Sequence, residues 1–263
     1  MLSCMEPIIR QDINTKDVTV YVIGDVHYGD PLCDRKGFTA LLDKIRDDPQ
    51  ARVILVGDLL NNATKNSKSD VYTALIPPMT QKIEMTNLLE PIKDKILCGC
   101  SGNHENRTTR ESNQDVMYDI FAKLDIEDRY RNEMCFLLVR LGEKGQHVDS
   151  KCRPAYTFCV THGKGNSIYT GSSANAAERF ASRIEGVDLF VTGHTHKPLS
   201  FPVGKLVFDA RNKQIRTAQF RVVTAASWLG YGGYAAEKML APVARVCTTI
   251  KLSARHKHFS VEM

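Results

Sequence analysis

The sequence predicts an α/β fold in which two packed β-sheets are flanked by helices. Strand and helix patterns alternate through the first half of the 263 residues, whereas strand signals dominate the second half. Five short polar clusters follow directly after predicted strands. In open α/β sheets, ligands collect outside the carboxyl ends of the strands. We therefore expect the polar clusters to form one functional site.

The first predicted strand, Val20–Ile23, is a short apolar run that ends at Gly24. Such a run is typical of a buried central strand, and the glycine marks its end. Asp25 and His27 follow. Because side chains two apart in an extended chain point to the same side, we expect both to project together from the strand end. A carboxylate and an imidazole so placed can bind one metal ion, although such pairs also occur by chance on surfaces.

Predicted helices and strands alternate after this strand. Residues 31–48 carry Phe38, Leu41, Leu42 and Ile45, a spacing that predicts an amphipathic helix. The other elements expected in this half are strands at Arg52–Val56 and Lys95–Cys100, and helices at about Met79–Leu89, after the interruption at Pro77 and Pro78, and around Met117–Leu124.

Strand patterns prevail in the second half. Candidate ligands extend from Asp25 to His196, so a domain boundary would split the site. We therefore interpret residues 1–263 as one domain, with a small helical insertion at about 63–94 and a β-rich basic part at about 197–263. The expected elements are strands at Cys135–Leu141, Ala155–Thr161 and Asp188–Val191, a turn-rich segment at Gly142–Pro154, a helix at Ala174–Ile184, and hairpin turns near 211–213 and 254–256.

Composition and charge narrow the class of protein. The charged fraction of 25% and the hydrophobic fraction of 43% are ordinary for a globular protein. No run approaches 18 consecutive apolar residues, and the first residues lack a basic end followed by an apolar core. We therefore expect no membrane-spanning helix, no membrane partner and no secretory signal. The eight cysteines are unevenly spaced and most lie in apolar runs, which indicates buried thiols in a reducing cytoplasm.

The net charge of +5 is unevenly distributed. Residues 197–263 contain 11 Lys and Arg against 3 acids, a balance of +8, so residues 1–196 carry −3. A basic C-terminal part is what a surface that binds a polyanion needs. The alternative interpretation is an ordinary solvated hairpin surface.

Imidazoles and carboxylates gather at the five strand ends. Together these groups suit zinc, iron and manganese better than calcium, and they are too many for one ion. Two ions about 3.5–4 Å apart can activate a water molecule and hold the oxygens of a phosphoryl group. One carboxylate must then bridge them. The groups offered are Asp25 and His27, then Asp58, then Asn103 and His104, then His162, and finally His194 and His196.

Two of these residues have a predicted individual role. Asp58 is the natural bridge, because it is the only carboxylate that stands alone at its strand end. His104 is a candidate general acid for the departing alkoxide, because it is adjacent to a presumed ligand, Asn103, where a phosphate would lie. The alternative role for His104 is to cap the helix that follows it.

Five motifs in a fixed order resemble the calcineurin-like metallophosphoesterase superfamily over roughly residues 20–197. They are Gly-Asp-x-His at 24–27, Gly-Asp-x-x-Asn at 57–61, Gly-Asn-His-Glu at 102–105, Thr-His-Gly at 161–163 and Gly-His-x-His at 193–196. The resemblance implies two mixed sheets packed as a sandwich between helices, in four layers ordered αββα.

The resemblance also implies the chemistry. A hydroxide that bridges two divalent ions would attack phosphorus in line, and His104 would assist the leaving group, so that the cations carry much of the catalysis. We expect Mn²⁺, with Fe²⁺, Zn²⁺ or Ni²⁺ as alternatives, because all of them tolerate such ligands. The implied ligands are Asp25, His27, Asp58 and His196 for the first ion, and Asp58, Asn103, His162 and His194 for the second.

The sequence departs from the superfamily pattern at two adjacent positions. Many members have Asp and then Arg where Asn61 and Asn62 stand here. Since that arginine helps the phosphoprotein phosphatases to bind phosphate, its absence argues against a Ser/Thr protein phosphatase and favours the phosphodiesterase and nuclease-like branches. Asn61, Asn62 and Arg107 are candidate contacts to the substrate. Local turn formation or an ordinary surface role is the alternative for each.

Three functional hypotheses follow. The first is a binuclear metal-dependent phosphodiesterase that acts on a phosphate ester, which could be a nucleotide. The second is a DNA or RNA nuclease, which the basic residues after Lys197 favour. The third is a non-catalytic metal-binding scaffold on the same fold, which would be expected to lack some of the ligands.

Overall fold

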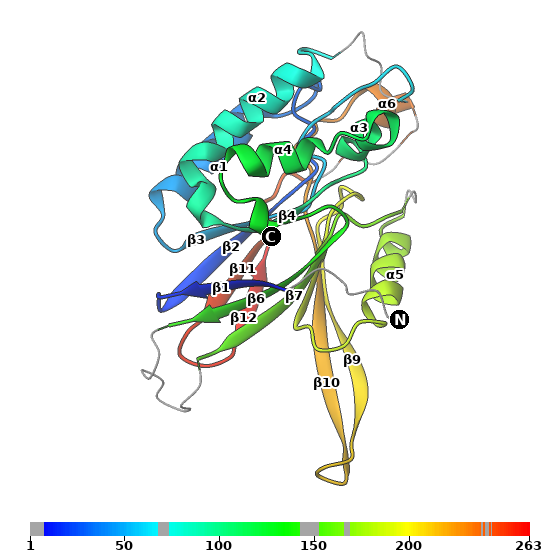
Figure 1. The fold of residues 1–263 in the computed structure, drawn as a ribbon. Helices are drawn as coiled ribbons and strands as arrows, with labels where there is room; N and C mark the ends of the chain where they lie inside the picture. The colour runs from blue at the N-terminus through cyan, green and yellow to red at the C-terminus, as the bar shows by residue number, and fades with distance from the viewer. Residues whose placement is uncertain are drawn as a thin grey trace.

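The computed structural model contains two mixed β-sheets of six strands each, packed face to face (Figure 1). It describes residues 8–67, 74–142, 153–165, 169–237, 239, 242 and 244–263. The first sheet has the order β1-β6-β7-β8-β10-β9, formed by β1 (Ile9–Ile13), β6 (Met134–Leu141), β7 (Ala155–Thr161), β8 (Leu189–Thr192), β10 (Gln214–Thr224) and β9 (Leu199–Asp209).

The second sheet joins the early strands to the last ones. Its strands β2 to β5 run parallel to one another, and β11 pairs antiparallel with β2. We continue to interpret the chain as one domain, because the final strands complete the sheet that the early strands begin. The order is β12-β11-β2-β3-β4-β5, formed by β12 (Phe259–Glu262), β11 (Thr249–Ser253), β2 (Asp17–Ile23), β3 (Ala51–Leu55), β4 (Ile96–Cys100) and β5 (Tyr130–Arg131).

Helices cover the outer faces of both sheets (Figure 1). Helices α1, α2 and α4 lie over the second sheet, and α5 lies over the first, which confirms the four layers. None of the helices in the described ranges is long and apolar enough to cross a membrane. The helices are α1 (Arg35–Asp47), α2 (Pro78–Leu89), α3 (Glu105–Ser112), α4 (Val116–Lys123), α5 (Thr170–Ala181) and α6 (Gly233–Glu237), with short 3₁₀ turns at Glu90–Lys95 and Glu127–Arg129.

Apolar side chains fill the space between the two sheets. Val20 and Val22 of β2 and Tyr156 and Phe158 of β7 are all buried in this layer. The alternate side chains of β2, Tyr21 among them, point to the opposite face and pack under the helices. A strand that is buried on both faces has a continuous apolar sequence, which is why β2 was recognisable as a central strand.

Several predicted elements differ from the structure. The helix expected at Ala174–Ile184 begins earlier, at Thr170, and ends at Ala181. The low helix propensity of residues 170–173 hid its first turn, in which Ser173 is buried in the folded chain. Strand β1 was not predicted, since only its two end residues are buried. Most of the turn-rich segment at Gly142–Pro154 and part of the insertion at 63–94 lie outside the described residues.

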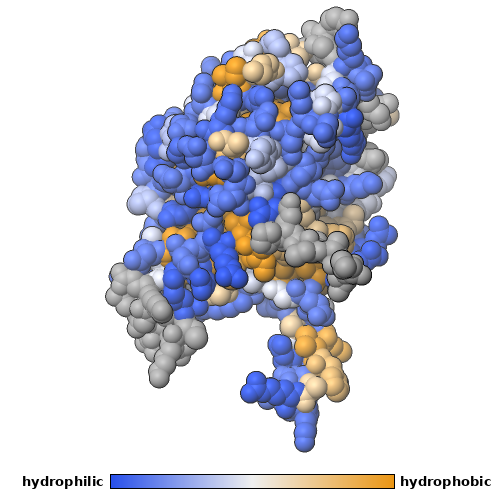
Figure 2. All heavy atoms as spheres, viewed as in Figure 1, coloured by the Kyte–Doolittle hydropathy of each residue, from blue (hydrophilic) through white to orange (hydrophobic). Residues whose placement is uncertain are grey.

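The hairpin β9–β10 projects from the body of the molecule as a two-stranded arm (Figure 1). The predicted turn near 211–213 lies at its tip. Leu206, Phe208 and Ile215 on this arm are 74%, 80% and 69% exposed, and Figure 2 shows apolar residues at the surface along it. The outer part of the arm, about residues 204–218, therefore contributes little to the core, whereas Phe220 and Val222 at its base are buried.

Candidate metal centre

Two buried carboxylates, Asp25 after β2 and Asp58 after β3, lie at the centre of the site. In each, one oxygen accepts a hydrogen bond from a backbone N–H of another loop. Asp25 Oδ2 accepts from His194 N at 2.8 Å, and Asp58 Oδ1 accepts from His104 N at 2.8 Å. Asp25 Oδ1 is buried and has no hydrogen-bond partner among the described residues. Each carboxylate thus keeps one oxygen for another ligand.

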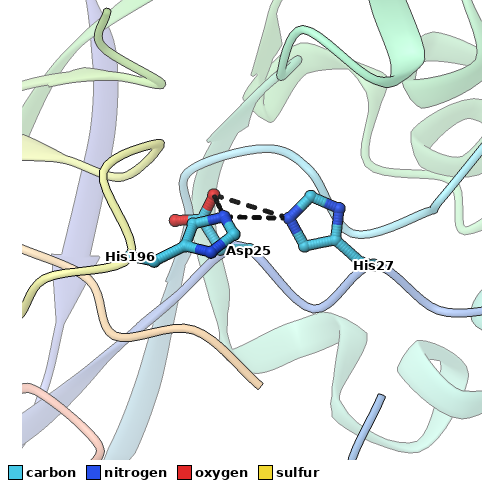
Figure 3. A group of neighbouring side chains, drawn as sticks. All are labelled: Asp25, His27 and His196. Atoms are coloured by element: carbon cyan, nitrogen blue, oxygen red, sulfur yellow. Dashed lines mark hydrogen bonds and ion pairs between the residues drawn. The ribbon is translucent and has the colours of Figure 1, made fainter. Parts of the chain in front are cut away.

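The first group of ligands surrounds the second oxygen of Asp25 (Figure 3). His196 Nε2 lies 3.3 Å from Asp25 Oδ1, and His27 Nε2 lies 4.0 Å from it. The two imidazole nitrogens are 3.1 Å apart. A buried carboxylate oxygen without a hydrogen bond, faced by two imidazoles, has the composition and geometry of a divalent metal site.

The second group converges on His162 Nε2. Asn103 Oδ1 and His194 Nδ1 are each 3.1 Å from this nitrogen, and Asp58 Oδ2 is 3.2 Å away. His162 Nδ1 donates to the carbonyl of Val56 at 2.7 Å. Three acceptor atoms therefore face Nε2 of His162, while the bond from Nδ1 to Val56 fixes the ring. A cation bound at this position would be surrounded by ligand atoms. The four residues fit a second divalent ion.

Asp58 connects the two groups. The same oxygen, Oδ2, is 3.2 Å from His162 Nε2 in the second group and 4.0 Å from His27 Nε2 in the first. A single carboxylate oxygen that faces both sets of ligands is what a bridging ligand requires. The structure thus brings together all seven residues that the sequence analysis proposed as ligands.

The ligand loops have an unusual backbone conformation. Asp25 and His27 were expected to project from an extended strand, but β2 ends at Ile23 and both residues have positive φ. The two side chains converge through a turn, which the backbone bond from His27 N to Asp58 O at 2.9 Å helps to hold. Positive φ values cluster at functional sites, where they cost on the order of 1–3 kcal/mol each. They are 50° at Asp25, 50° at His27, 51° at Asp58, 69° at His194 and 57° at His196.

Glycines allow the loops to approach one another closely. A Cβ atom on Gly102 would collide with the carboxylate and the backbone nitrogen of Asp58. A Cβ atom on Gly57, which has φ of 81°, would collide with the backbone of Gly102. The loops after β3 and β4 therefore pack backbone to backbone, and this contact positions Asp58.

The charges in the site shift the pKa values of the ligands. Burial would raise the pKa of Asp58, but the nearby imidazoles of His162 and His104 outweigh it and hold this pKa well below its usual range. Burial would lower the pKa of His162, but the charge of Asp58 raises it to about 10. Burial and the charge of His104 lower the pKa of His27. His162 is therefore the ligand at which a proton competes most strongly with a metal.

His104 lies at the mouth of the site. Its Nδ1 is 2.8 Å from the carbonyl oxygen of Asn61 and 3.3 Å from Nδ1 of His27. Its Nε2 is 3.9 Å from Asp58 Oδ2. Burial lowers the pKa of His104. A bond from Nδ1–H to Asn61 O leaves Nε2 toward the site, and the geometry would also let His104 join His27 and Asp58 as a ligand.

Glu105, the first residue of α3, has a role that the sequence analysis did not assign. Its buried carboxylate accepts three backbone N–H bonds of 2.9 Å each, from Asp58, Leu60 and Gly102. Burial and the charge of Asp58 raise its pKa to about 7. The carboxylate of Glu105 thus links the backbone of the loop that carries Asp58 to the backbone of the loop that carries His104. The only sequence signal was an acidic residue directly after Asn103 and His104.

Asn61, Asn62 and Arg107 lie beside His104. The Asn62 side chain donates to His104 O at 2.8 Å and to Thr108 Oγ1 at 2.9 Å, so it holds the start of α3. Arg107 donates to Asn61 O at 3.1 Å, the same carbonyl that contacts His104. The structure therefore places these residues around the candidate acid, and their contact with a substrate stays a prediction.

Known proteins and family models show what the chain is similar to. No curated protein matches the chain. Among solved structures, the chain is similar to a conserved uncharacterized protein described as a predicted phosphoesterase from Streptococcus pneumoniae, with 14% identity, a TM-score of 0.37, and coverage of 94% of this chain and 89% of that one. It is also similar to Vacuolar Protein Sorting 29 from Cryptosporidium parvum, with 16% identity, a TM-score of 0.40, and coverage of 95% and 97%. Residues 18–198 match the model of the calcineurin-like phosphoesterases, and the chain belongs to this family.

Proposed function

We propose that the chain is a binuclear metal-dependent phosphodiesterase. The observation that carries the proposal is the position of Asp58 Oδ2, which faces the ligands of both groups. Two bound cations would supply a polarised phosphoryl group and an activated water molecule. The ligand residues would hold these cations at a fixed separation, and the buried setting of Asp25 and Asp58 would exclude competing water from the ligand oxygens.

His104 is the residue that we assign to proton transfer. The Asn61 carbonyl accepts from Nδ1–H and orients the ring so that Nε2 faces the site. Nε2 would donate a proton to the departing oxygen from the imidazolium form, after which the ring remains neutral with its proton on Nδ1. Asn62 and Arg107 position this ring indirectly, through the start of α3 and through the shared Asn61 carbonyl. A diester suits the site better than a monoester, because a diester carries one negative charge less and the arginine typical of protein phosphatases is replaced by Asn62.

We propose Mn²⁺ as the ion, with Fe²⁺, Zn²⁺ and Ni²⁺ as alternatives, because the ligands combine imidazoles with carboxylate and amide oxygens. We also propose a reducing compartment, such as the cytoplasm. The support for this is that the six described cysteines are free thiols, of which Cys98, Cys100, Cys135 and Cys159 are buried.

The test is hydrolysis of bis-p-nitrophenyl phosphate with added Mn²⁺. We expect turnover by the wild type, and a loss of about 10²–10³-fold in kcat/KM for Asp58→Asn, since removing one charge-stabilising group costs about that much. Asp43→Asn, which changes an exposed carboxylate on α1, is the matched control and should keep full activity. Absence of turnover with Mn²⁺, Fe²⁺, Zn²⁺ and Ni²⁺ alike would refute the enzyme and favour a metal-binding scaffold.

A second candidate function is cleavage of DNA or RNA, and the projecting arm favours it. Lys205, Arg211, Lys213 and Arg216 lie on β9, β10 and their turn, against a single carboxylate, Asp209. A positively charged hairpin that extends beyond the body could follow the backbone of a single strand. The salt dependence of binding to single-stranded DNA tests this candidate.

The arm variant for this test is Arg211→Gln with Lys213→Gln. If the arm binds nucleic acid, the wild type should bind more weakly as salt rises, and the variant should show a smaller dependence, by about 0.7 in the logarithmic slope per lost phosphate contact. Lys36→Gln with Lys123→Gln, two exposed residues on α1 and α4, is the control. A slope that is equal in all three proteins would exclude this role of the arm.

A further inference from the structure

A cavity of about 590 Å³ lies between α5 and the outer face of the first sheet, next to the metal centre. Its volume is in the range of pockets that hold small organic molecules. The strand ends at Thr161, Thr192 and Thr224 form its floor, and Ser173, Ala177 and Phe180 of α5 form the opposite wall. The metal ligands do not line it, so this is a separate site.

The cavity shares a wall with the loops that carry three of the metal ligands. Gly163 follows His162, Gly193 precedes His194, and Thr195 lies between His194 and His196, and these three residues line the cavity. Gly165 lines it too, and its carbonyl oxygen is 2.8 Å from His194 Nε2. A molecule in the cavity would therefore lie directly behind the ligands of the second ion.

Positively charged side chains line this cavity. Lys164, Arg179 and Arg183 line it, and no carboxylate from the described part of the chain does. None of the three cations makes an ion pair with another residue in the described ranges. Cations that are not neutralised by acids, placed around a concave surface, are the arrangement that binds phosphate or carboxylate groups.

The remaining lining combines hydroxyl side chains with apolar ones, among them two phenylalanine rings. Phe180 and Phe190 lie with their ring centroids 5.8 Å apart, and Phe180 is 42% exposed beside the cavity. The hydroxyl oxygen of Thr195 is buried and has no hydrogen-bond partner among the described residues. An exposed aromatic face together with a buried hydroxyl suits a flat ring that carries a few polar atoms.

We propose that this cavity binds an organic anion with a flat, largely apolar body, of the class of a nucleoside monophosphate. The anionic group would contact Lys164, Arg179 or Arg183, the ring would lie against Phe180, and a polar atom of the ring would pair with Thr195. The inference concerns binding alone and does not depend on hydrolysis at the metal centre.

Calorimetric titration of the metal-free protein tests the proposal, with three probes: adenosine 5′-monophosphate, adenosine and inorganic phosphate. The monophosphate should bind one molecule per chain, at least tenfold more tightly than either fragment. Arg179→Gln with Arg183→Gln should weaken it at least tenfold. Since both side chains are exposed, this variant should fold normally. Ala177→Trp, which fills the cavity, should abolish binding, and thermal melting shows whether it folds.

Two control variants locate the binding. Arg255→Gln, an exposed arginine in the β11–β12 turn, and Asp58→Asn should both bind the monophosphate as the wild type does. An affinity that Asp58→Asn changes as much as the cavity variant does would place the ligand in the metal centre and overturn the proposal. So would an affinity equal to that of phosphate, an affinity that the cavity variants leave unchanged, or no binding at millimolar concentration. A protein that binds the monophosphate but hydrolyses nothing would refute only the proposed function.

Discussion

The backbone N–H of His194 donates a hydrogen bond of 2.8 Å to Oδ2 of Asp25, across 169 residues of sequence. This bond fixes the Asp25 carboxylate so that its other oxygen faces His27 and His196. His104 N does the same for Asp58. Each carboxylate is therefore oriented by a loop from elsewhere in the chain, and the two groups of metal ligands form as one unit when the sheets assemble.

The first prediction concerns His27→Ala. The imidazole of His27 belongs to the first group of ligands only, so its loss should weaken the first ion while the second remains bound. In the metal-free protein its Nε2 is 4.0 Å from both Asp25 Oδ1 and Asp58 Oδ2, too far for a hydrogen bond, so the loss of this imidazole should cost little stability. Metal analysis should give about one ion per chain, with a nearly unchanged melting temperature. Loss of both ions together would show that the groups are not separable.

The second prediction is a pH dependence of metal binding. Asp58 raises the pKa of His162 to about 10, above the ordinary value of 6.5, in spite of burial. The bound proton stabilises the metal-free fold fully below pH 6.5, and this contribution is lost as the pH rises through about 10. A metal at Nε2 must displace this proton. The affinity for Mn²⁺ should therefore rise about tenfold per pH unit between pH 6.5 and 8.5, measured as free Mn²⁺ by electron paramagnetic resonance. Constant affinity would contradict the assignment.

The third prediction compares two glycines. Gly102→Ala places a Cβ atom against the Asp58 carboxylate and backbone, and should destabilise the fold by about 1–3 kcal/mol, as overpacking does. Gly171→Ala on α5 meets no atom within 4 Å and should stabilise it by about 0.5–1 kcal/mol. Urea unfolding gives both values. Equal effects of the two substitutions would show that the close contact between the loops is not required.

The fourth prediction concerns the arm. Phe208→Ala should change the free energy of unfolding by less than about 0.5 kcal/mol, because this ring is 80% exposed. Phe220→Ala lies on the same hairpin, where β10 crosses the body, and its ring is 2% exposed. It should cost about 3–5 kcal/mol. If Phe208→Ala lowers the free energy of unfolding as much as Phe220→Ala does, the ring of Phe208 is buried in solution by contact with another molecule.

The ends of the parallel strands were predictable from sequence. Strands such as β2, which are buried on both faces, have continuous apolar sequences. Because the strands are parallel, the polar residues that follow them lie at the same edge of the sheet, at its carboxyl end. This rule predicts that Asp25, Asp58 and His162 lie at one edge, and the structure brings these residues together, while their role as metal ligands stays a prediction.

The conformation of the loops was not predictable. Nothing local distinguishes an Asp or His with positive φ from an extended one, so the turn at Asp25 and His27 was missed. The role of Glu105 was hidden for a different reason, because its three N–H partners come together only in the folded chain. Strand β1, with few buried residues, is held by pairing with β6, which is far away in sequence.

The most direct test of the binuclear centre is the metal content of the wild type and Asp58→Asn, each loaded with Mn²⁺ and freed of excess ion. We predict two ions per chain for the wild type. Asp58→Asn should retain one at most, because the oxygen that faces both His27 and His162 loses its charge. A wild type with a single ion, or an Asp58→Asn variant that keeps both, would contradict the bridging role of Asp58.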